Sequence, residues 1–304
     1  MSEELKKEFP LPGELIHVNG RKIHVQRSGT GSPTVMFESG VIGTSLQFAK
    51  VQPEISIITS TLSYDRAGLG YSEKSPNPKR ISSVIASELF ELLDTLGLHE
   101  PLVLVGASAG GIYIREFAQQ HPGMVAGMVF IDSAHESQNN RYPEEIALKL
   151  KQEDDQKIEL FTRLSKMTHE ELLKELPDPL PWQNSHPDTH KYFADLERPE
   201  MFEYYLELLA LFEEDTDQAK RALKSLENIP LIVISRSKAN FPGLDEEQNK
   251  LATEIRTNLQ NELAELSISS RHIKVNSGHD ISNEKPEIVI EAIKEMVERI
   301  REKK

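Results

Sequence analysis

The segment PLVLVGASAGGIYIREFAQQH, residues 101–121, limits the possible folds of this chain more than any other. Its first half is an uninterrupted apolar run, typical of a strand that is buried on both faces of a parallel sheet. Small residues follow, from Gly106 to Gly110, and then a helical pattern that ends at Pro122-Gly123. A strand turns sharply into a helix only where side chains are small, because the two elements approach closely there. The segment therefore predicts a β-α unit inside a sheet that is covered on both sides.

The same alternation continues along the chain. Apolar runs of strand length occur at 33–40, within 55–68, and at 125–133, 229–236 and 270–278, and helical patterns occur at 81–98, 249–267 and 285–304. Two alternating runs meet at Asn19-Gly20, a strong signal for a hairpin. These patterns predict an α/β fold with a mostly parallel, doubly wound sheet and an N-terminal antiparallel hairpin. In such a sheet the functional residues follow the carboxyl ends of the strands.

One long stretch departs from this alternation. Residues 136–227 have helical periodicity, many Glu and Lys residues and most of the aromatic residues, but no convincing strand pattern. We therefore expect a core formed by residues 1–135 and 228–304, with residues 136–227 inserted as a helical cap.

Composition excludes several classes of protein. The formal net charge of the 304 residues is -14, which disfavours binding to nucleic acid or to an anionic membrane. The chain has no cysteine, so disulfides, thiolate nucleophiles and cysteine metal sites are excluded. No apolar run approaches the ~20 residues that a membrane span needs. The first residues are charged and do not resemble a secretory signal, so we expect a cytoplasmic protein.

Ser108 is the candidate nucleophile, because it occupies the centre of the Gly-x-Ser-x-Gly pattern between strand and helix. The alternative is an ordinary small residue at a tight turn. A serine hydroxyl needs a base, and His279 follows the last strand pattern directly, in VNSGHDI. The chain has 10 histidines, but only His279 combines this position with the order serine, acid, histidine. His135 also lies near a strand end and is a candidate for the lining of a pocket.

The acid that would orient the histidine has two candidates. Asp132 directly follows the strand pattern at 125–131, so it lies at the same sheet edge as Ser108. Asp245 is the first carboxylate after the strand pattern at 229–236, but it lies nine residues beyond the end of that pattern. We favour Asp132 and retain Asp245 as the alternative, although either residue could simply cap a helix or turn.

An oxyanion hole needs two N–H donors. One is expected from Ala109, the residue after the nucleophile, and the other from the loop SGVIGTS after the strand pattern at 33–38. We assign the second donor to the Val41 N–H, with Gly40 shaping the turn.

These motifs together resemble the α/β-hydrolase superfamily. SGVIG stands where the superfamily usually carries a His-Gly-x-Pro type loop, and YDRAGLGYSE resembles its D-R-x-G-x-G-x-S segment. GASAG matches the nucleophile elbow and SGHDI matches the histidine loop. The resemblance covers residues 14–135 and 228–300. In the segment YDRAGLGYSE we expect Asp65 and Arg66 to shape the loop through a structural salt bridge and backbone hydrogen bonds; the alternative is a direct contact with substrate.

Two departures from the superfamily pattern bear on function. Ser39 replaces the usual histidine of the oxyanion loop, and no carboxylate follows the strand at 229–236 closely. Haloalkane dehalogenases place their acid at the position of Asp132. They and the related epoxide hydrolases use an aspartate nucleophile, however, so the serine at position 108 disfavours both.

The resemblance implies a serine carboxylesterase that acts on a small-molecule ester with apolar parts and needs neither a metal nor an organic cofactor. We expect His135, Trp182, Phe202 and Tyr205 to contact the substrate. The alternatives are a prolyl-type aminopeptidase, another hydrolase with the same triad (a thioesterase or C–C hydrolase), or a non-catalytic binding protein.

Overall fold

A single mixed sheet forms the centre of the molecule. The computed structural model describes residues 12–175, 199–219, 225–237 and 241–303, and within them eight strands pair in the order β1-β2-β4-β3-β5-β6-β7-β8. The strands are β1 (Glu14–Val18), β2 (Arg21–Ser28), β3 (Val35–Glu38), β4 (Thr61–Tyr64), β5 (Leu102–Ala107), β6 (Val125–Ile131), β7 (Leu231–Arg236) and β8 (Ser270–Val275).

The sheet has the predicted mixture of directions. β1 and β2 form an antiparallel hairpin in which Val18 pairs with Arg21 across the Asn19-Gly20 turn. β2 also pairs with β4 in the antiparallel direction. The remaining neighbours in the sheet, β4-β3, β3-β5, β5-β6, β6-β7 and β7-β8, are all parallel. The predicted α/β fold with its N-terminal antiparallel hairpin is therefore confirmed.

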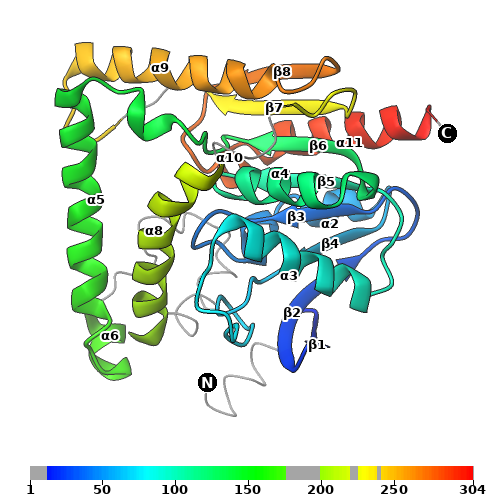
Figure 1. The fold of residues 1–304 in the computed structure, drawn as a ribbon, viewed down its shortest axis with the longest axis horizontal. Helices are drawn as coiled ribbons and strands as arrows, with labels where there is room; N and C mark the ends of the chain where they lie inside the picture. The colour runs from blue at the N-terminus through cyan, green and yellow to red at the C-terminus, as the bar shows by residue number, and fades with distance from the viewer. Residues whose placement is uncertain (1–11, 176–198, 220–224, 238–240, 304) are drawn as a thin grey trace.

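Helices cover both faces of the sheet (Figure 1). They are α2 (Gln52–Ser56), α3 (Ser82–Thr95), α4 (Gly110–Gln120), α5 (Glu144–Leu164), α6 (His169–Glu175), α8 (Pro199–Ala219), α9 (Glu246–Ala264), α10 (Ile281–Glu284) and α11 (Pro286–Arg301). α3, α4 and α9 contribute to the hydrophobic cluster on one face of the sheet. α2, α10 and α11 contribute to the cluster on the other face.

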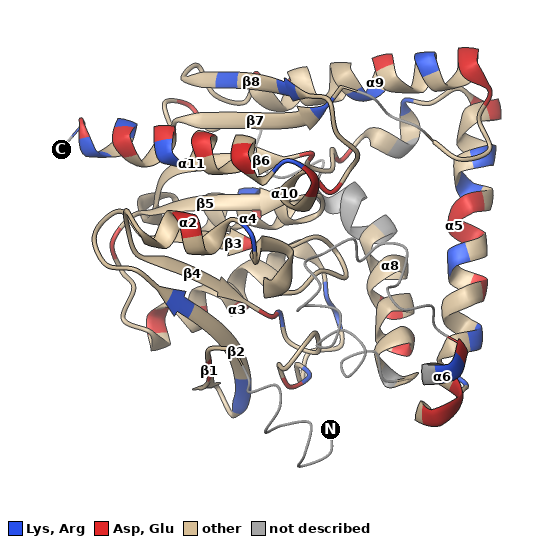
Figure 2. Ribbon diagram, turned by 180° about the vertical axis from the view of Figure 1, so that it is seen from behind, with Lys and Arg blue, Asp and Glu red and all other residues tan. Residues whose placement is uncertain are grey.

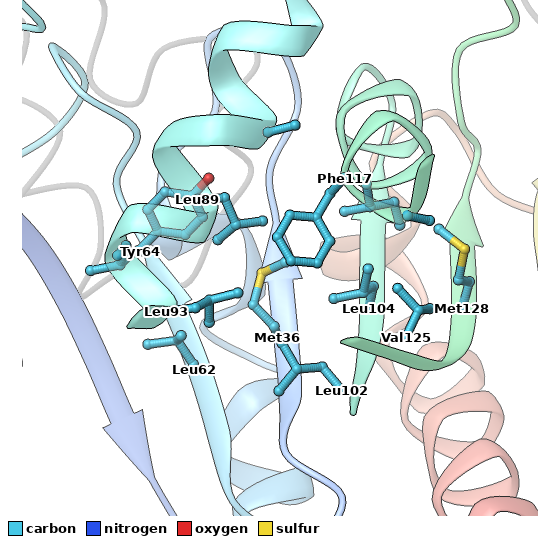
Figure 3. Packing of buried hydrophobic residues seen from close by; sticks show 14 of the residues in the cluster. Met36, Leu62, Tyr64, Leu89, Leu93, Leu102, Leu104, Phe117, Val125 and Met128 are labelled. Atoms are coloured by element: carbon cyan, nitrogen blue, oxygen red, sulfur yellow. The ribbon is translucent and has the colours of Figure 1, made fainter. Parts of the chain in front are cut away.

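β5 shows why an uninterrupted apolar run becomes a central strand. Successive side chains point to opposite faces, so Leu102 and Leu104 join one cluster while Val103 and Val105 join the other. Figure 3 shows the first cluster, where Leu104 packs near Phe117 of α4. All residues of β5 are buried, which a strand covered on both faces requires.

The helices α5, α6 and α8, here called the inserted helices, lie between β6 and β7 in sequence. They have their own hydrophobic cluster, which includes Phe161 and Phe202. In Figure 1 the carboxyl end of β7 points toward them. Charged residues of both signs run along α5 (Figure 2), as expected for a helix with one solvated face. Among the described helices, none combines the length and the apolar character needed to cross a membrane.

Candidate active site

The turn between β5 and α4 holds Ser108 in a conformation that non-glycine residues seldom adopt, with φ at 53°. Glycine is required on both sides of it. A Cβ on Gly106 would lie 2.8 Å from the carbonyl carbon of Gly110, and one on Gly110 would lie 2.3 Å from the oxygen of Glu38. The Ser108 N–H donates to the oxygen of Ile131 at 3.0 Å, which anchors the turn to β6. The strand-to-helix turn predicted for Ser108 is present.

The loop after β8 brings His279 to Ser108. The Nε2 atom of His279 lies 3.1 Å from Ser108 Oγ, and its Nδ1 atom lies 2.5 Å from Asp132 Oδ2. The Glu284 carboxylate holds this loop, because it accepts the Gly278 N–H at 2.7 Å. The chain of hydrogen bonds Ser108–His279–Asp132 is the geometry in which an imidazole can accept a proton from a serine hydroxyl.

Asp132 is fully buried and is flanked by two cations that the sequence analysis did not single out. Nη2 of Arg256 lies 2.8 Å from its carboxylate, and Nε of Arg236 lies 3.4 Å from it. Burial on its own would raise the pKa of Asp132. The positive charge of Arg256, followed by the hydrogen bond from His279 and the charge of Arg236, outweighs burial and holds that pKa well below its usual range. The carboxylate is therefore ionised throughout the neutral range.

The alternative acid, Asp245, has a different task. Its side chain accepts the Gln248 N–H at 2.9 Å and caps the N-terminus of α9. The position directly after β7 carries no carboxylate, and Arg236 at the end of that strand has its backbone N–H 3.3 Å from Asp132 Oδ1. A cation at this strand end thus supports the carboxylate of the neighbouring strand.

The loop after β3 passes over the nucleophile. A Cβ on Gly40 would lie 3.4 Å from the Cβ of Ser108. The Gly40 N–H is already occupied, because it donates to Gln47 Oε1 at 2.9 Å. The N–H groups of Val41 and Ala109, by contrast, find no acceptor among the described residues. These are the two donors that the sequence analysis assigned to an oxyanion hole.

Asp65 and Arg66 do not pair with each other, which corrects the expected salt bridge. Adjacent residues at the end of a strand point to opposite sides, so each finds a different partner. Asp65 binds Nδ1 of His24 at 2.8 Å, and Arg66 binds the buried carboxylate of Glu38. Glu38 and His24 were not recognised from the sequence, because each lies far along the chain from its partner.

The residues predicted to contact substrate fall in different places. Phe202 and Tyr205 are buried in the cluster of the inserted helices, against which Val41 packs. The ring of His135 faces Glu262, with Nε2 at 3.5 Å, and its Nδ1 accepts the Ser137 N–H. Trp182 lies outside the described residues.

Phe212 of α8 is a neighbour of the site that was not among the residues selected from the sequence as substrate contacts. It packs against the cluster that contains Ala109 and against a second cluster that contains Ala134. The Ala134 N–H in turn donates to the oxygen of Ser108 at 2.9 Å. The sequence signal for Phe212 was weak, because an aromatic residue on an amphipathic helix usually packs within its own subdomain.

In the described part of the chain, no three His, Asp or Glu side chains converge as a metal site would require.

The chain belongs to the α/β-hydrolase fold family, because the model of that family matches residues 33–199. An AB hydrolase superfamily protein of Gibberella zeae is 33% identical over 113 residues, which make up 36% of this chain and 35% of that protein. The chain spans less than half the length of the curated relatives that it matches.

Solved structures extend the likeness to nearly the whole chain. A thermophilic esterase from Thermogutta terrifontis is 19% identical, with a TM-score of 0.64 over 95% of this chain and 99% of the esterase. The epoxide hydrolase CorEH is 21% identical, with a TM-score of 0.67 over 93% of this chain and 97% of that one. At these identities the structures show a shared fold.

Proposed function

We propose that this protein is a serine hydrolase that cleaves carboxylic esters of small to medium apolar substrates through an acyl-enzyme. The observation that carries the proposal is the hydrogen-bonded chain of Ser108, His279 and Asp132, with Ser108 Oγ 3.1 Å from the imidazole. The N–H groups of Val41 and Ala109, which have no acceptor among the described residues, support it. Donors aimed at a developing oxyanion are a large part of acyl-transfer catalysis.

In the proposed reaction, Ser108 Oγ attacks the ester carbonyl while His279 Nε2 accepts its proton. The negative charge that forms on the carbonyl oxygen is stabilised by the Val41 and Ala109 N–H groups. His279 then returns the proton to the leaving alcohol, and the acyl group stays on Ser108. A water molecule, deprotonated by His279, attacks the acyl-enzyme, and His279 returns that proton to Ser108 Oγ as the carboxylic acid leaves. Asp132 holds the imidazole with its proton on Nδ1 and stabilises the imidazolium in both steps.

The surroundings of Ser108 favour an acyl substrate with apolar parts over an epoxide. A serine hydroxyl activated by a histidine is a nucleophile for acyl transfer, whereas an aspartate nucleophile is the group expected in an epoxide hydrolase. Val41 and Phe212 present apolar side chains next to Ala109, which favours an apolar acyl or alcohol part. The inserted helices, on which Phe212 lies, would act as the cap that selects the substrate.

A fluorophosphonate probe tests the nucleophile. We expect the wild type to be labelled and Ser108→Ala to remain unlabelled, with Ser87→Ala as a control because Ser87 is exposed on α3. Failure of the wild type to react would favour a non-catalytic binding protein. A panel of p-nitrophenyl esters of increasing acyl length, run beside aminoacyl arylamides and thioesters, then separates the classes of substrate. Preferential cleavage of the arylamides would replace the esterase with a prolyl-type aminopeptidase.

A further inference from the structure

The side chain of Arg66 holds the loop after β3 from the side opposite the nucleophile. Its side chain is 3% exposed, and its guanidinium binds three consecutive carbonyl oxygens. Nη1 donates to the Ser39 oxygen at 2.9 Å, and Nη2 donates to the oxygens of Gly40 and Val41, the latter at 2.9 Å. A planar group with five N–H donors in a fixed fork suits this task, which the single ammonium of lysine cannot perform.

The planarity of the peptide bond makes these contacts directional. In a trans peptide the C=O of one residue and the N–H of the next point in opposite directions. Because Arg66 binds the oxygen of Gly40, the N–H of Val41 must point away from Arg66. Gly40 lies against Ser108, so the far side of this peptide is the side of the nucleophile.

The preceding peptide is fixed at both ends. The Ser39 oxygen accepts from Arg66, and the Gly40 N–H donates to Gln47 Oε1 at 2.9 Å. The Ser39 hydroxyl closes the loop by donating to the oxygen of Gly43 at 2.8 Å. Every polar group of these two peptides therefore has a partner among the described residues, apart from the Val41 N–H.

We propose that Arg66 is a positioning residue for acyl transfer, which orients the Val41 N–H toward the oxyanion by holding the carbonyls behind it. The inference rests on the proposed serine hydrolase function. It also explains how a loop with Ser39 in place of the usual histidine keeps its shape: Arg66, Gln47 and the Ser39 hydroxyl hold it together.

The charge of Arg66 is balanced without involving the reacting atoms. Glu38 binds it from the end of β3, and the Tyr64 hydroxyl donates to the other carboxylate oxygen of Glu38 at 2.5 Å. The Tyr113 ring lies 5.0 Å from the guanidinium carbon. Glu38 and Tyr64 are fully buried or nearly so, which keeps the guanidinium in one place.

The substitution Arg66→Lys keeps the charge and removes the fork. We expect kcat for a p-nitrophenyl ester to fall roughly 10²-fold with little change in KM, since the Val41 N–H would no longer be held toward the oxyanion, which forms only in the transition state. The affinity for a trifluoromethyl ketone, which forms an oxyanion on the serine, should fall in parallel. Arg80→Lys is the matched control: Arg80 is equally buried but pairs with Glu88, so its replacement should leave both quantities within about threefold of the wild type.

Gln47→Met is the second variant. It tests the same positioning of the Val41 N–H if Arg66→Lys does not fold. It removes the acceptor of the Gly40 N–H, and we expect a smaller loss, roughly tenfold, that again falls on kcat and on ketone affinity. A folded variant of either kind with wild-type kcat and ketone affinity would overturn the inference. A wild type that neither turns over esters nor reacts with fluorophosphonate would instead refute the proposed function itself.

Discussion

Two residues of the site, Ser108 and Asp132, hold positive φ angles of 53° and 40°. Neither is glycine, so each conformation persists only because its surroundings impose it. The backbone of Ser108 is bonded to β6, and the Asp132 N–H donates to the oxygen of Ile234 in β7 at 2.7 Å. Nη2 of Arg256 also donates to the carbonyl oxygen of Asp132 at 3.0 Å. The same guanidinium thus fixes both the backbone and the carboxylate of the residue that orients His279.

Asp132→Asn should lower kcat on the order of 10³–10⁴-fold, because the amide can no longer hold the imidazole with its proton on Nδ1. It should also cost about 3–5 kcal/mol of folding free energy, since Arg236 and Arg256 lose a buried counter-charge. Asp245→Asn should change neither, because asparagine caps a helix as well as aspartate. Ester kinetics and urea unfolding of both variants measure these effects. Were Asp245→Asn to lose the activity instead, the acid would be wrongly assigned.

At the residue scale, the sequence predicts the location of residues that directly follow the end of a strand. Ser108, Asp132 and His279 each follow a strand, and parallel strands end at one edge, so their meeting follows from the pattern. Arg256 lies in the middle of a helix, where the pattern indicates only which face is apolar. Its contact with Asp132 depends on how α9 packs beside β7, which no local pattern determines.

At the scale of elements, α8 is attached to the core through the loop after β4. The Tyr204 hydroxyl donates to the oxygen of Ala67 at 2.7 Å. A Cβ on Gly68 would lie 2.6 Å from the Tyr204 ring, so only glycine permits this contact. Gly68 also has a φ of 85°, which glycine adopts without strain. The D-R-x-G-x-G motif thus includes a docking point for the inserted helices.

Two glycine substitutions distinguish the cost of backbone strain from the cost of losing the contact between Gly68 and Tyr204. Gly97 has a φ of 69°, and a Cβ added there would meet nothing within 4 Å, so Gly97→Ala should cost only the backbone strain, about 1–2 kcal/mol. Gly68→Ala should cost at least about 1 kcal/mol more, since Tyr204 must move and its buried hydrogen bond is lost. Urea unfolding measures both. Equal costs would show that Tyr204 does not hold α8 to the loop.

At the scale of the whole molecule, the fold was more predictable than the contacts that join its parts. Buried strands and the Asn19-Gly20 hairpin follow from periodicity and turn chemistry, and the sheet confirms them. The buried pair of His24 and Asp65 does not follow from either. It links β2 to the loop after β4, and Asp65 also accepts the N–H of Ser45 at 2.8 Å, which attaches the end of the loop that follows β3.

This pair should make the stability of the whole fold depend on pH. Burial alone lowers the pKa of His24, but the hydrogen bond and charge of Asp65 outweigh it and raise that pKa above 6.5. Burial raises the pKa of Asp65, but His24 outweighs it and lowers that pKa below 3.8. The stabilisation from His24 is therefore complete below pH 6.5 and is lost as pH rises through the higher folded value. The stabilisation from Asp65 is present above pH 3.8 and is lost in acid.

His24→Gln removes the titrating imidazole and retains a side chain that can donate to Asp65. We expect the wild type to exceed this variant in free energy of unfolding by about 1.5–3 kcal/mol near pH 5.5, the range of a buried hydrogen bond between charged groups. The difference should shrink toward pH 9, as the imidazole of the wild type loses its charge. His99→Gln replaces an exposed histidine and is the control for effects of buffer composition and of net charge. A difference between wild type and His24→Gln that stays constant from pH 5.5 to pH 9 would contradict this expectation, because it would mean that folding does not change the pKa of His24.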